Sequence, residues 1–587
     1  MFLLAIWFGL VTGLVEGGIK TTLRGVPGFV FLNSADILWV APAVNVLLFL
    51  AVALAGALVS RLLPAPATVA QAGGLFAWLS LCGLLWALGK LSPWAALLLS
   101  LGLAIQCGRW LRRREERFVQ LVANSTAVLL LAALVAGSFG AGWDGWRERQ
   151  ALAALPESGA HPPNLLLITL DTLRADHLSS YGHARLTTPN LDQLAATGVA
   201  FDRAIANSPW TLPSHATLLT GRLPYEHKAD WLSALDGAYP TLTEVLAARG
   251  YVTAAFAANT TYVTPEWGLG RGFTHFEVYS NSLSDQVTRT AYGKKLALTL
   301  LPRFGYFDIP GRKRAADLNR QFLRWLDGVG SRPFFALLNY LDVHDPYLPP
   351  PESAPPFSSE LSRGDLINFQ FQPTVFRRKA TLSEREVEME VAAYDACLAY
   401  LDAQLGALFA ELAARGQLHN TLVIVTSDHG ESFGNHDLFG HGNSLYSETL
   451  HVPLIMAWPG RLPAGRRVAQ VASLHHVAAT ALDLLGLGAP LPGTSLAGLW
   501  AGAAATAATP VFSEVNPGRF ADGLPHYPTA KGALRSLVTD QWHLIRSESG
   551  ATELYDWGSD RAETHNLAGT PAGQAVIRDL ERHFPQG

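Results

Sequence analysis

Residues 164–182 read NLLLITLDTLRADHLSSYG, and residues 207–223 read NSPWTLPSHATLLTGRL. The apolar run in the first stretch is too short for a helix and stops at Asp171, so it predicts a buried strand. An acid just past such a strand lies where open α/β sheets bind their ligands. In the second stretch Pro213 suits the first turn of a helix. Thr211 is therefore expected at a helix N-terminus, whose unpaired N–H groups can stabilise an anion that the hydroxyl attacks.

The pattern around these stretches predicts an α/β fold with a mixed sheet flanked by helices. Short apolar runs alternate with helical patterns after residue 164, which is typical of such sheets. The candidate strands are Leu165–Leu170, Tyr251–Ala257, Phe334–Tyr340, Leu422–Thr426 and Pro453–Ala457. A long amphipathic pattern at Glu384–Arg415 predicts a helix that covers the core.

Composition divides the 587 residues into four parts. The predicted parts are a transmembrane helical domain at 1–142, a polar linker at 143–163, a catalytic domain at 164–500 and a C-terminal α+β subdomain at 501–587. The net charge of −4 and the pI near 6.5 give no indication of a nucleic-acid partner. The mean hydropathy of +0.18 is high for a soluble enzyme, and the excess lies in the first 140 residues.

The N-terminal part contains five apolar runs, at Phe2–Val15, Ile37–Val59, Gly74–Gly89, Pro93–Cys107 and Phe118–Phe139. The second and fifth are long enough to span a bilayer, which takes about 20 residues. The third and fourth are marginal and are expected to form a helical hairpin. The first lacks the basic start and the small-residue cleavage site of a signal peptide, so we expect it to remain as a span.

Basic residues predict the orientation of these spans. Five arginines lie between the fourth and fifth runs, namely Arg109, Arg112, Arg113, Arg114 and Arg117. Positively charged loops stay in the cytoplasm, so the fifth run crosses outward and the catalytic domain faces the periplasm or cell exterior. Lys20 and Arg24 then lie outside the cytoplasm, against this charge rule. The total count of basic residues in the cytoplasmic loops still favours this topology. Glu16 and Asn45 are expected to pair between helices or to contact a lipid headgroup.

A second informative stretch, residues 421–442, reads TLVIVTSDHGESFGNHDLFGHG. Its apolar run ends at Asp428, and His429 follows at once. With Asp171 and the Thr211 oxygen, these side chains make a ligand set of carboxylates, hydroxyl and imidazole. Such a set suits Zn²⁺ or Mn²⁺ better than Ca²⁺, although Ca²⁺ remains an alternative. One or two divalent ions are expected, and a cation at Thr211 would lower the pKa of its hydroxyl.

Four further side chains are candidates for contacts with the substrate. His441 lies across a Gly-rich loop from Asp428, and His344 follows the candidate strand at 334–340. Either can bind the transferred group and protonate the leaving group, or the two can hold a second metal. His215 lies four residues after Thr211, so it can face the same anion. Arg222 is a candidate for substrate binding or for an ion pair.

The whole stretch from residue 164 to residue 566 resembles the sulfatase family of the alkaline phosphatase superfamily. The resemblance is carried, in order, by the Asp171 segment, TLPSHATLLTGRLP, GYVTAAF, VHDPYLPP, SDHGESFGNHDLFGHG, VPLIMAWPG and ELYDWGSDRAETHNLA. It implies an alkaline-phosphatase-like core, a metal at Asp171, Asp428 and His429, a nucleophile at Thr211, and substrate contacts from His344 and His441.

The chain departs from the family pattern at several of these positions. The family motif C-x-P-x-R or S-x-P-x-R, whose first residue becomes formylglycine, is here TLPSH. Thr211 cannot become that aldehyde, so its ester must be hydrolysed or passed to an acceptor. Thr172 replaces a second aspartate, and His429 replaces the usual asparagine. Where many members carry Gly-Lys-Trp-His, this chain has AANTTYV, in which Asn259 is a candidate for a substrate contact.

These observations predict a membrane-anchored, sulfatase-family metalloenzyme that cleaves sulfate or phosphate esters through a covalent Thr211 intermediate. The threonine, the Asp-His pair and the membrane runs are also similar to lipid-linked phosphoethanolamine and phosphoglycerol transferases. The alternative is therefore a transferase that moves a lipid headgroup to a cell-envelope acceptor. A second alternative is a membrane binding protein with a dead site. The expected partners are a sulfated or phosphorylated substrate, a membrane lipid or a glycan; the sequence predicts no oligomeric state.

Overall fold

The computed structural model describes most of the chain. The described residues are 1–23, 36–61, 68–159, 162–278, 283–304, 312–351, 353, 362–370, 382–488, 490–501, 509–518 and 525–585. They form two compact units. One comprises Met1–Ala151 with Tyr279–Arg312, and the other comprises Leu152–Val278 with Lys313–Gly587.

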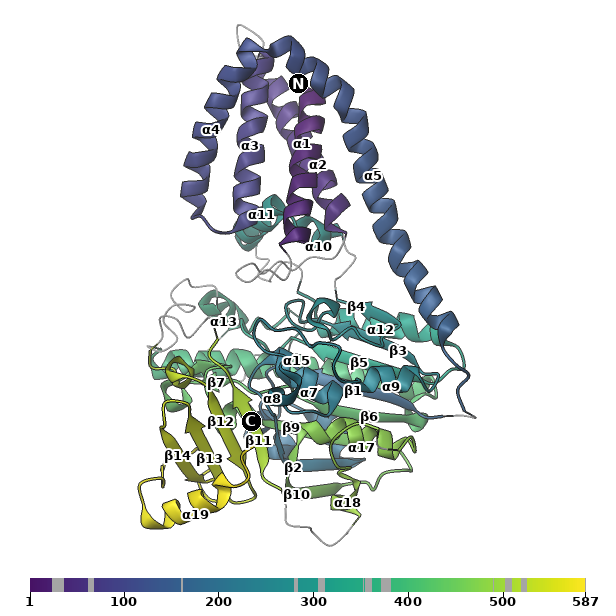
Figure 1. The fold of residues 1–587 in the computed structure, drawn as a ribbon, viewed down its shortest axis with the longest axis vertical. Helices are drawn as coiled ribbons and strands as arrows, with labels where there is room; N and C mark the ends of the chain where they lie inside the picture. Colours follow the sequence, from purple (N-terminus) through teal and green to yellow (C-terminus); the bar gives the residue numbers. More distant parts are fainter. Residues whose placement is uncertain are drawn as a thin grey trace. The chain divides into compact units, whose positions relative to one another are not determined.

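The first unit is built on five long helices, α1 to α5 (Figure 1). Their bounds are Phe2–Thr22, Ile37–Ser60, Val69–Leu88, Pro93–Arg113 and Glu115–Ala154. All five predicted runs are thus helical, and each is long and apolar enough to cross a membrane. Helix α5 continues to Ala154, so the segment predicted as a linker at 143–163 is helical over its first half.

An insert from the catalytic part of the sequence belongs to this first unit. It comprises α10 (Leu283–Thr288), α11 (Ala291–Leu300) and a 3₁₀ turn at Leu301–Phe304. This insert lies within residues 164–500, which the sequence assigned to the catalytic domain. The insert escaped detection because its short helices read like the other helices of an α/β pattern.

A buried polar cluster joins the insert to the N-terminal helices. The Glu16 carboxylate accepts hydrogen bonds from Lys20 Nζ at 2.6 Å and from the Ala291 backbone N–H at 2.7 Å. Asn45 Nδ2 donates to the other carboxylate oxygen at 3.1 Å, and Lys20 Nζ also donates to the Arg289 carbonyl at 2.7 Å. Among the roles predicted for Glu16 and Asn45, pairing between helices is the one observed.

The second unit is organised around an eight-stranded mixed sheet in the order β10-β2-β9-β6-β1-β5-β3-β4 (Figure 1). The strands are β1 Asn164–Leu170, β2 Val199–Ile205, β3 Val252–Ala257, β4 His275–Glu277, β5 Phe334–Tyr340, β6 Thr421–Thr426, β9 His451–Ala457 and β10 Arg466–Ser473. Strand β9 runs antiparallel to both of its neighbours. The central strands β5, β1 and β6 are parallel, so their carboxyl ends meet at one edge.

Helices cover both faces of this sheet. One hydrophobic core contains residues of α7, α9 and α17, and the other contains residues of α6, α12 and α15. The bounds are α6 Pro189–Ala196, α7 Thr211–Thr220, α8 Pro224–His227, α9 Leu242–Ala247, α12 Ala315–Val329, α13 Arg363–Gln370, α15 Glu384–Ala414, α16 Ser447–Leu450, α17 Val477–Leu484 and α18 Ala497–Trp500. Helix α15 is apolar enough to resemble a span, but it packs on the sheet as the sequence predicted.

The C-terminal part forms a four-stranded antiparallel sheet, β11-β12-β13-β14, with helix α19 (Figure 1). The bounds are β11 Val511–Val515, β12 Leu534–Val538, β13 Trp542–Ser547, β14 Thr552–Asp556 and α19 Pro571–Glu581. A separate small core joins α19 to the sheet. The predicted α+β character of this part is therefore observed.

Candidate active site

The ends of three neighbouring strands and the start of one helix hold the candidate site. Asp171 follows β1, His344 follows β5, and Asp428 with His429 follows β6. Thr211 is the first residue of α7, after the extended Trp210. Strand β1 lies between β5 and β6, so the side chains that follow these three strands lie at the same edge of the sheet.

The Thr211 hydroxyl lies beside the Asp-His pair. Its Oγ1 atom is 3.3 Å from His429 Nε2, and both residues are buried. Asp171, Asp428 and His429 each place one ligand atom within 4.8 Å of the others. The three separated segments predicted to meet around one cation are therefore together.

The donors at this centre fit a divalent cation. Within the part of the chain that the structure describes, Asp171 Oδ1 and Asp428 Oδ2 are buried and accept no hydrogen bond. A carboxylate oxygen left in this state is costly unless a cation or proton compensates it. Burial raises the pKa of Asp428, and burial together with the His441 charge lowers the pKa of His429 to about 3. The His429 ring is thus neutral near pH 7 and can act as a metal ligand.

A side chain of the loop after β3 and one of strand β5 orient Asp171. Asn259 Nδ2 donates to Asp171 Oδ2 at 2.8 Å, and Asn339 Nδ2 lies 3.4 Å from the same oxygen. Asn259 was predicted to bind the substrate, whereas its amide here holds a carboxylate of the centre. Thr172 adopts φ +62°, unusual for a β-branched residue, and its hydroxyl donates to the Val343 carbonyl. Thr172, at the position of the family's second aspartate, thus has its hydroxyl engaged by the backbone.

His441 is held against the centre by a buried glutamate. Its Nδ1 atom lies 3.0 Å from Glu431 Oε1, and Tyr347 donates its hydroxyl to Glu431 Oε2 at 2.9 Å. The His441 ring centroid lies 4.5 Å from that of His429 and 5.1 Å from that of His344. Burial opposes the charged ring, but the negative charges of Glu431, Asp171 and Asp428 together outweigh that effect and raise the pKa of His441.

His215 contacts the nucleophile through the backbone. Its Nδ1 atom lies 2.9 Å from the Thr211 carbonyl oxygen and 3.6 Å from Asp428 Oδ2. Its Nε2 atom lies 3.1 Å from the Thr169 hydroxyl. These contacts suit a residue that positions the first turn of α7 more than one that binds an anion directly.

Arg222 is not brought to the site. It follows the C-terminal end of α7, about 15 Å from Thr211 at the rise of an α-helix. Its guanidinium donates to Glu226 Oε1 at 2.7 Å and lies over the Tyr239 ring at 3.9 Å. These contacts correspond to the ion-pair alternative.

Sequence reasoning missed Glu431, Asn339 and an aromatic wall beside Thr211. The Trp210 ring stacks on Trp231 with centroids 3.6 Å apart and lies 5.1 Å from the His441 centroid. Glu431 stands three residues after Asp428 in the quoted motif, so its position was visible. Its role was not, because the folding of the Gly-rich loop decides which histidine it meets.

A second cluster of potential ligands is satisfied internally. Asp395 accepts from His177 Nδ1 at 2.7 Å, from His183 Nε2 at 3.1 Å and from Arg185 Nη1 at 2.7 Å. The arginine supplies the positive charge that a metal would bring, and these contacts lower the pKa of Asp395 despite its burial. The cluster therefore joins α15 to the loop after β1.

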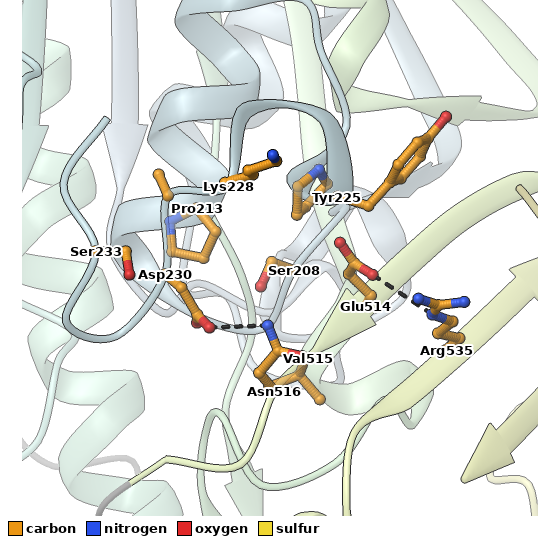
Figure 2. A pocket seen from close by; sticks show the side chains of 12 residues that line it. Ser208, Pro213, Tyr225, Lys228, Asp230, Ser233, Glu514, Val515, Asn516 and Arg535 are labelled. Atoms are coloured by element: carbon orange, nitrogen blue, oxygen red, sulfur yellow. Dashed lines mark hydrogen bonds and ion pairs between the residues drawn. The ribbon is translucent and has the colours of Figure 1, made fainter. Parts of the chain in front are cut away.

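A polar cavity of about 370 Å³ lies against another side of α7 (Figure 2). Pro213 and Glu514 line this cavity. Pro213 lies two residues after Thr211, and positions two residues apart project to nearly opposite sides of a helix. The cavity therefore does not open on the Thr211 hydroxyl. Glu514 Oε2 lies 3.7 Å from Nε of Arg535, which also lines the cavity. Burial raises the pKa of Glu514 to about 7, against the effect of Arg535.

Comparison with known proteins agrees with this geometry. The Sulfatase family model matches residues 163–487, and the model for the C-terminal part of N-sulphoglucosamine sulphohydrolase matches residues 434–586. The chain is 27% identical over 442 residues to arylsulfatase K of Mus musculus, covering 69% of this chain and 76% of that protein. It is 28% identical over 473 residues to arylsulfatase A of Homo sapiens, covering 70% and 85% respectively.

A solved structure supports the fold. The phosphonate monoester hydrolase of Agrobacterium radiobacter superimposes with a TM-score of 0.56 at 25% identity, covering 72% of this chain and 94% of that one. The predicted alkaline-phosphatase-like fold is thereby confirmed. Because the Sulfatase model alone spans more than half of the residues, the chain belongs to the sulfatase family and is a sulfuric ester hydrolase by descent and fold.

Proposed function

We propose that this protein is a membrane-anchored, metal-dependent sulfatase-family hydrolase whose nucleophile is the Thr211 hydroxyl. One observation carries the proposal: that hydroxyl lies 3.3 Å from His429 Nε2, among buried carboxylate oxygens of Asp171 and Asp428 that accept no hydrogen bond from the described residues. Asp171, Thr211, Asp428 and His429 would hold the ion, with zinc or manganese preferred by the donor set.

The reaction we propose has two displacement steps. A bound divalent ion would favour the alkoxide form of Thr211 and neutralise charge on the substrate. The Thr211 oxygen attacks the sulfur or phosphorus atom, and the bond from that atom to the leaving oxygen breaks. His441 gives its Nε2 proton to the leaving oxygen, while His344 binds the transferred group. Water then attacks the same sulfur or phosphorus atom and gives one proton back to His441. The bond to Thr211 Oγ1 breaks, sulfate or phosphate is released, and the Thr211 oxygen takes up a proton to restore the hydroxyl.

The test is hydrolysis of 4-nitrophenyl sulfate and 4-nitrophenyl phosphate by the full-length protein in detergent. Thr211→Ala and Asp428→Asn are expected to lower kcat at least about 1,000-fold, as loss of a nucleophile or its activator does. Thr220→Ala, which removes a buried hydroxyl of the same helix, is the matched control and should retain activity. Equal activity in Thr211→Ala and the parent would contradict the proposal.

Headgroup transfer is the second candidate function. The threonine nucleophile and the five apolar helices ahead of the catalytic unit favour it. The protein is incubated with phosphatidylethanolamine or phosphatidylglycerol, and tryptic peptides are analysed by mass spectrometry. A headgroup-phosphate adduct on Thr211 that persists without an acceptor supports transfer. Free sulfate from the aryl ester, with no lipid-derived adduct, supports hydrolysis.

The membrane part of the proposal is an outward-facing catalytic unit. It rests on the arginine-rich end of α4, which we place in the cytoplasm. An impermeant thiol reagent added to intact cells should label Leu186→Cys, an exposed position in the catalytic unit. It should leave Arg113→Cys unlabelled until the membrane is opened. The reverse pattern would invert the topology without touching the chemistry.

A further inference from the structure

A groove runs between helices α3 and α4 of the N-terminal unit. Its cavity of about 350 Å³ falls in the range of small-molecule sites, about 300 to 1,000 Å³. The helices approach closely at glycines: a Cβ added to Gly74 would lie 3.8 Å from Gly108 Cα. Bulky apolar side chains flank this approach, Leu75 and Trp78 on α3 and Ile105 on α4. Small residues at the contact and large ones beside it leave a channel with apolar walls.

The groove has one strongly cationic end. Arg109 and Arg112 both line it, three residues apart and therefore on one face of α4. Both side chains are exposed, and neither makes an ion pair or a hydrogen bond with the described residues. Large apolar side chains of α4 are also exposed, with Leu98 at 71% and Ile105 at 49%. A helix with such a surface is expected to face hydrocarbon.

We propose that this groove binds an anionic phospholipid of the cytoplasmic leaflet. The phosphate would lie on Arg109 and Arg112, whose planar guanidinium groups match phosphate oxygens. One acyl chain would lie against Trp78 and Ile105. Basic pockets between transmembrane helices on the cytoplasmic side take headgroups of this kind. The inference rests on the membrane part of the proposed function and is independent of the chemistry at Thr211.

The shape and charge of the groove decide between occupants. A soluble anion would use the two arginines and leave the apolar walls in contact with water. A further transmembrane helix would cover the walls and bury two guanidinium groups without a counter-charge, which is costly. A phospholipid with a net negative headgroup satisfies both ends at once. It is also the molecule that surrounds a membrane-spanning helix.

The experiment measures lipid retention by the full-length protein with native mass spectrometry. The probes are dioleoyl phosphatidylglycerol and dioleoyl phosphatidylcholine, added to protein in mild detergent. The double variant Arg109→Gln/Arg112→Gln should retain phosphatidylglycerol at least about tenfold less than the parent. The matched control, Arg113→Gln/Arg117→Gln, removes the same charge from neighbouring exposed positions outside the groove and should behave as the parent. Equal losses in the two variants would overturn the site in favour of diffuse attraction.

A second pair of variants tests the apolar walls. Gly74→Leu places a side chain in the groove and should abolish retention of phosphatidylglycerol. Gly102→Leu lies on the same helix pair, where an added Cβ meets nothing within 4 Å, and should retain it. Glycerol phosphate should not compete with the lipid at tenfold excess. Efficient competition, or equal retention of phosphatidylcholine, would overturn the proposal.

The two proposals fail in distinguishable ways. Hydrolysis of the aryl esters is measured on the same preparations. A preparation that retains phosphatidylglycerol specifically but is inactive would contradict the Thr211 mechanism and leave the lipid site standing. If carbonate treatment removes the protein from membranes and the protein still hydrolyses the esters, the lipid site and the membrane anchor are both overturned.

Discussion

Glu431 connects His441, which we propose as the catalytic histidine, to the hydrophobic core. It is fully buried, accepts the His441 contact on one oxygen and the Tyr347 hydroxyl on the other, and so fixes both the position and the charge of the ring. A carboxylate in this place favours the protonated histidine, which is the form able to protonate a leaving group. Glu431 therefore acts through His441 as a positioning residue.

Replacing Glu431 by glutamine keeps the shape of this contact and removes its charge. We expect kcat to fall by about 10- to 100-fold, because His441 loses the charge that raises its pKa. The alkaline limb of the pH profile of kcat/KM should move to lower pH. Glu226→Gln, which removes a surface partner of Arg222, is the control and should change neither. An unchanged pH profile in Glu431→Gln would show that His441 is not the titrating acid.

Glu514, in the cavity of Figure 2, makes a prediction about stability and pH. Its folded pKa of about 7 is raised above the ordinary 4.5 by burial. The folded state thus holds a proton that the unfolded chain releases. The ionised group destabilises the protein increasingly from about pH 4.5 to pH 7, and fully above that.

Glu514→Gln should therefore raise the free energy of unfolding by about 3 kcal/mol at pH 8 and leave it unchanged near pH 4. Arg535→Gln should act in the opposite direction at pH 8, since it removes the guanidinium that lies 3.7 Å from the carboxylate. Thermal unfolding at the two pH values measures both variants. A stabilisation that is the same at pH 4 and pH 8 would contradict the assignment.

At the scale of elements, the sequence predicted best where one strong pattern decided the outcome. Asp171 and Asp428 each end an apolar run, and those runs are the adjacent parallel strands β1 and β6. The edge strand β10, which begins with two arginines, and β2, which carries Asp202 and Arg203, lack such a run. The place of β2 depends on pairing with β9 and that of β10 on pairing with β2, and local sequence does not encode such long-range contacts.

Within the site, too, some side-chain positions were predictable from the sequence and others were not. Residue type and spacing were sufficient to predict where Thr211, Asp428 and His429 lie, because neighbouring positions at a strand end or helix start stay together in any fold of this class. The partner of Asn259 was not predictable. It depends on how the loop after β3 folds back over β1, and there the amide meets Asp171. Arg222 was ambiguous until Glu226 was found beside it.

The insert provides the prediction at this scale. Its α11 begins with a backbone N–H bonded to Glu16, which also holds Lys20. Removing one member of a buried ion pair leaves the other uncompensated and costs about 3 to 5 kcal/mol. Glu16→Gln should therefore destabilise the first unit more than the double variant Glu16→Gln/Lys20→Met. Thermal unfolding in detergent compares the two; a more stable single variant would mean that the pair is not energetically coupled.

At the scale of the whole molecule, the two units are linked more than once by the chain. Helix α5 leads from one to the other, and the insert at 279–312 leaves the catalytic sequence and returns to it. Tyr292 and Ala297 of the insert are buried within the first unit, and Tyr292 donates its hydroxyl to the Leu79 carbonyl. The catalytic part is thus not a detachable domain with a simple anchor.

A protein truncated before Leu152 should show this dependence. Without α1 to α4, the insert loses the surface that covers Tyr292 and Ala297, while Leu300 and Phe304 are already exposed. We expect the truncated protein to aggregate, because it presents a contiguous apolar patch. Replacing residues 283–304 by a short Gly/Ser linker should restore a soluble, folded protein. Size-exclusion chromatography distinguishes the truncated protein with the insert from the one with the linker. A monodisperse truncated protein that keeps the insert would contradict the proposal that the first unit covers the apolar residues of the insert.

The Thr211 nucleophile that we propose has one further consequence, for how the active enzyme is made. A formylglycine must be installed by a separate oxidation after translation, whereas a threonine is present as soon as the ribosome has placed it. Synthesis in a cell-free system or in a foreign host would then yield working enzyme with no maturation partner, given only membrane and metal.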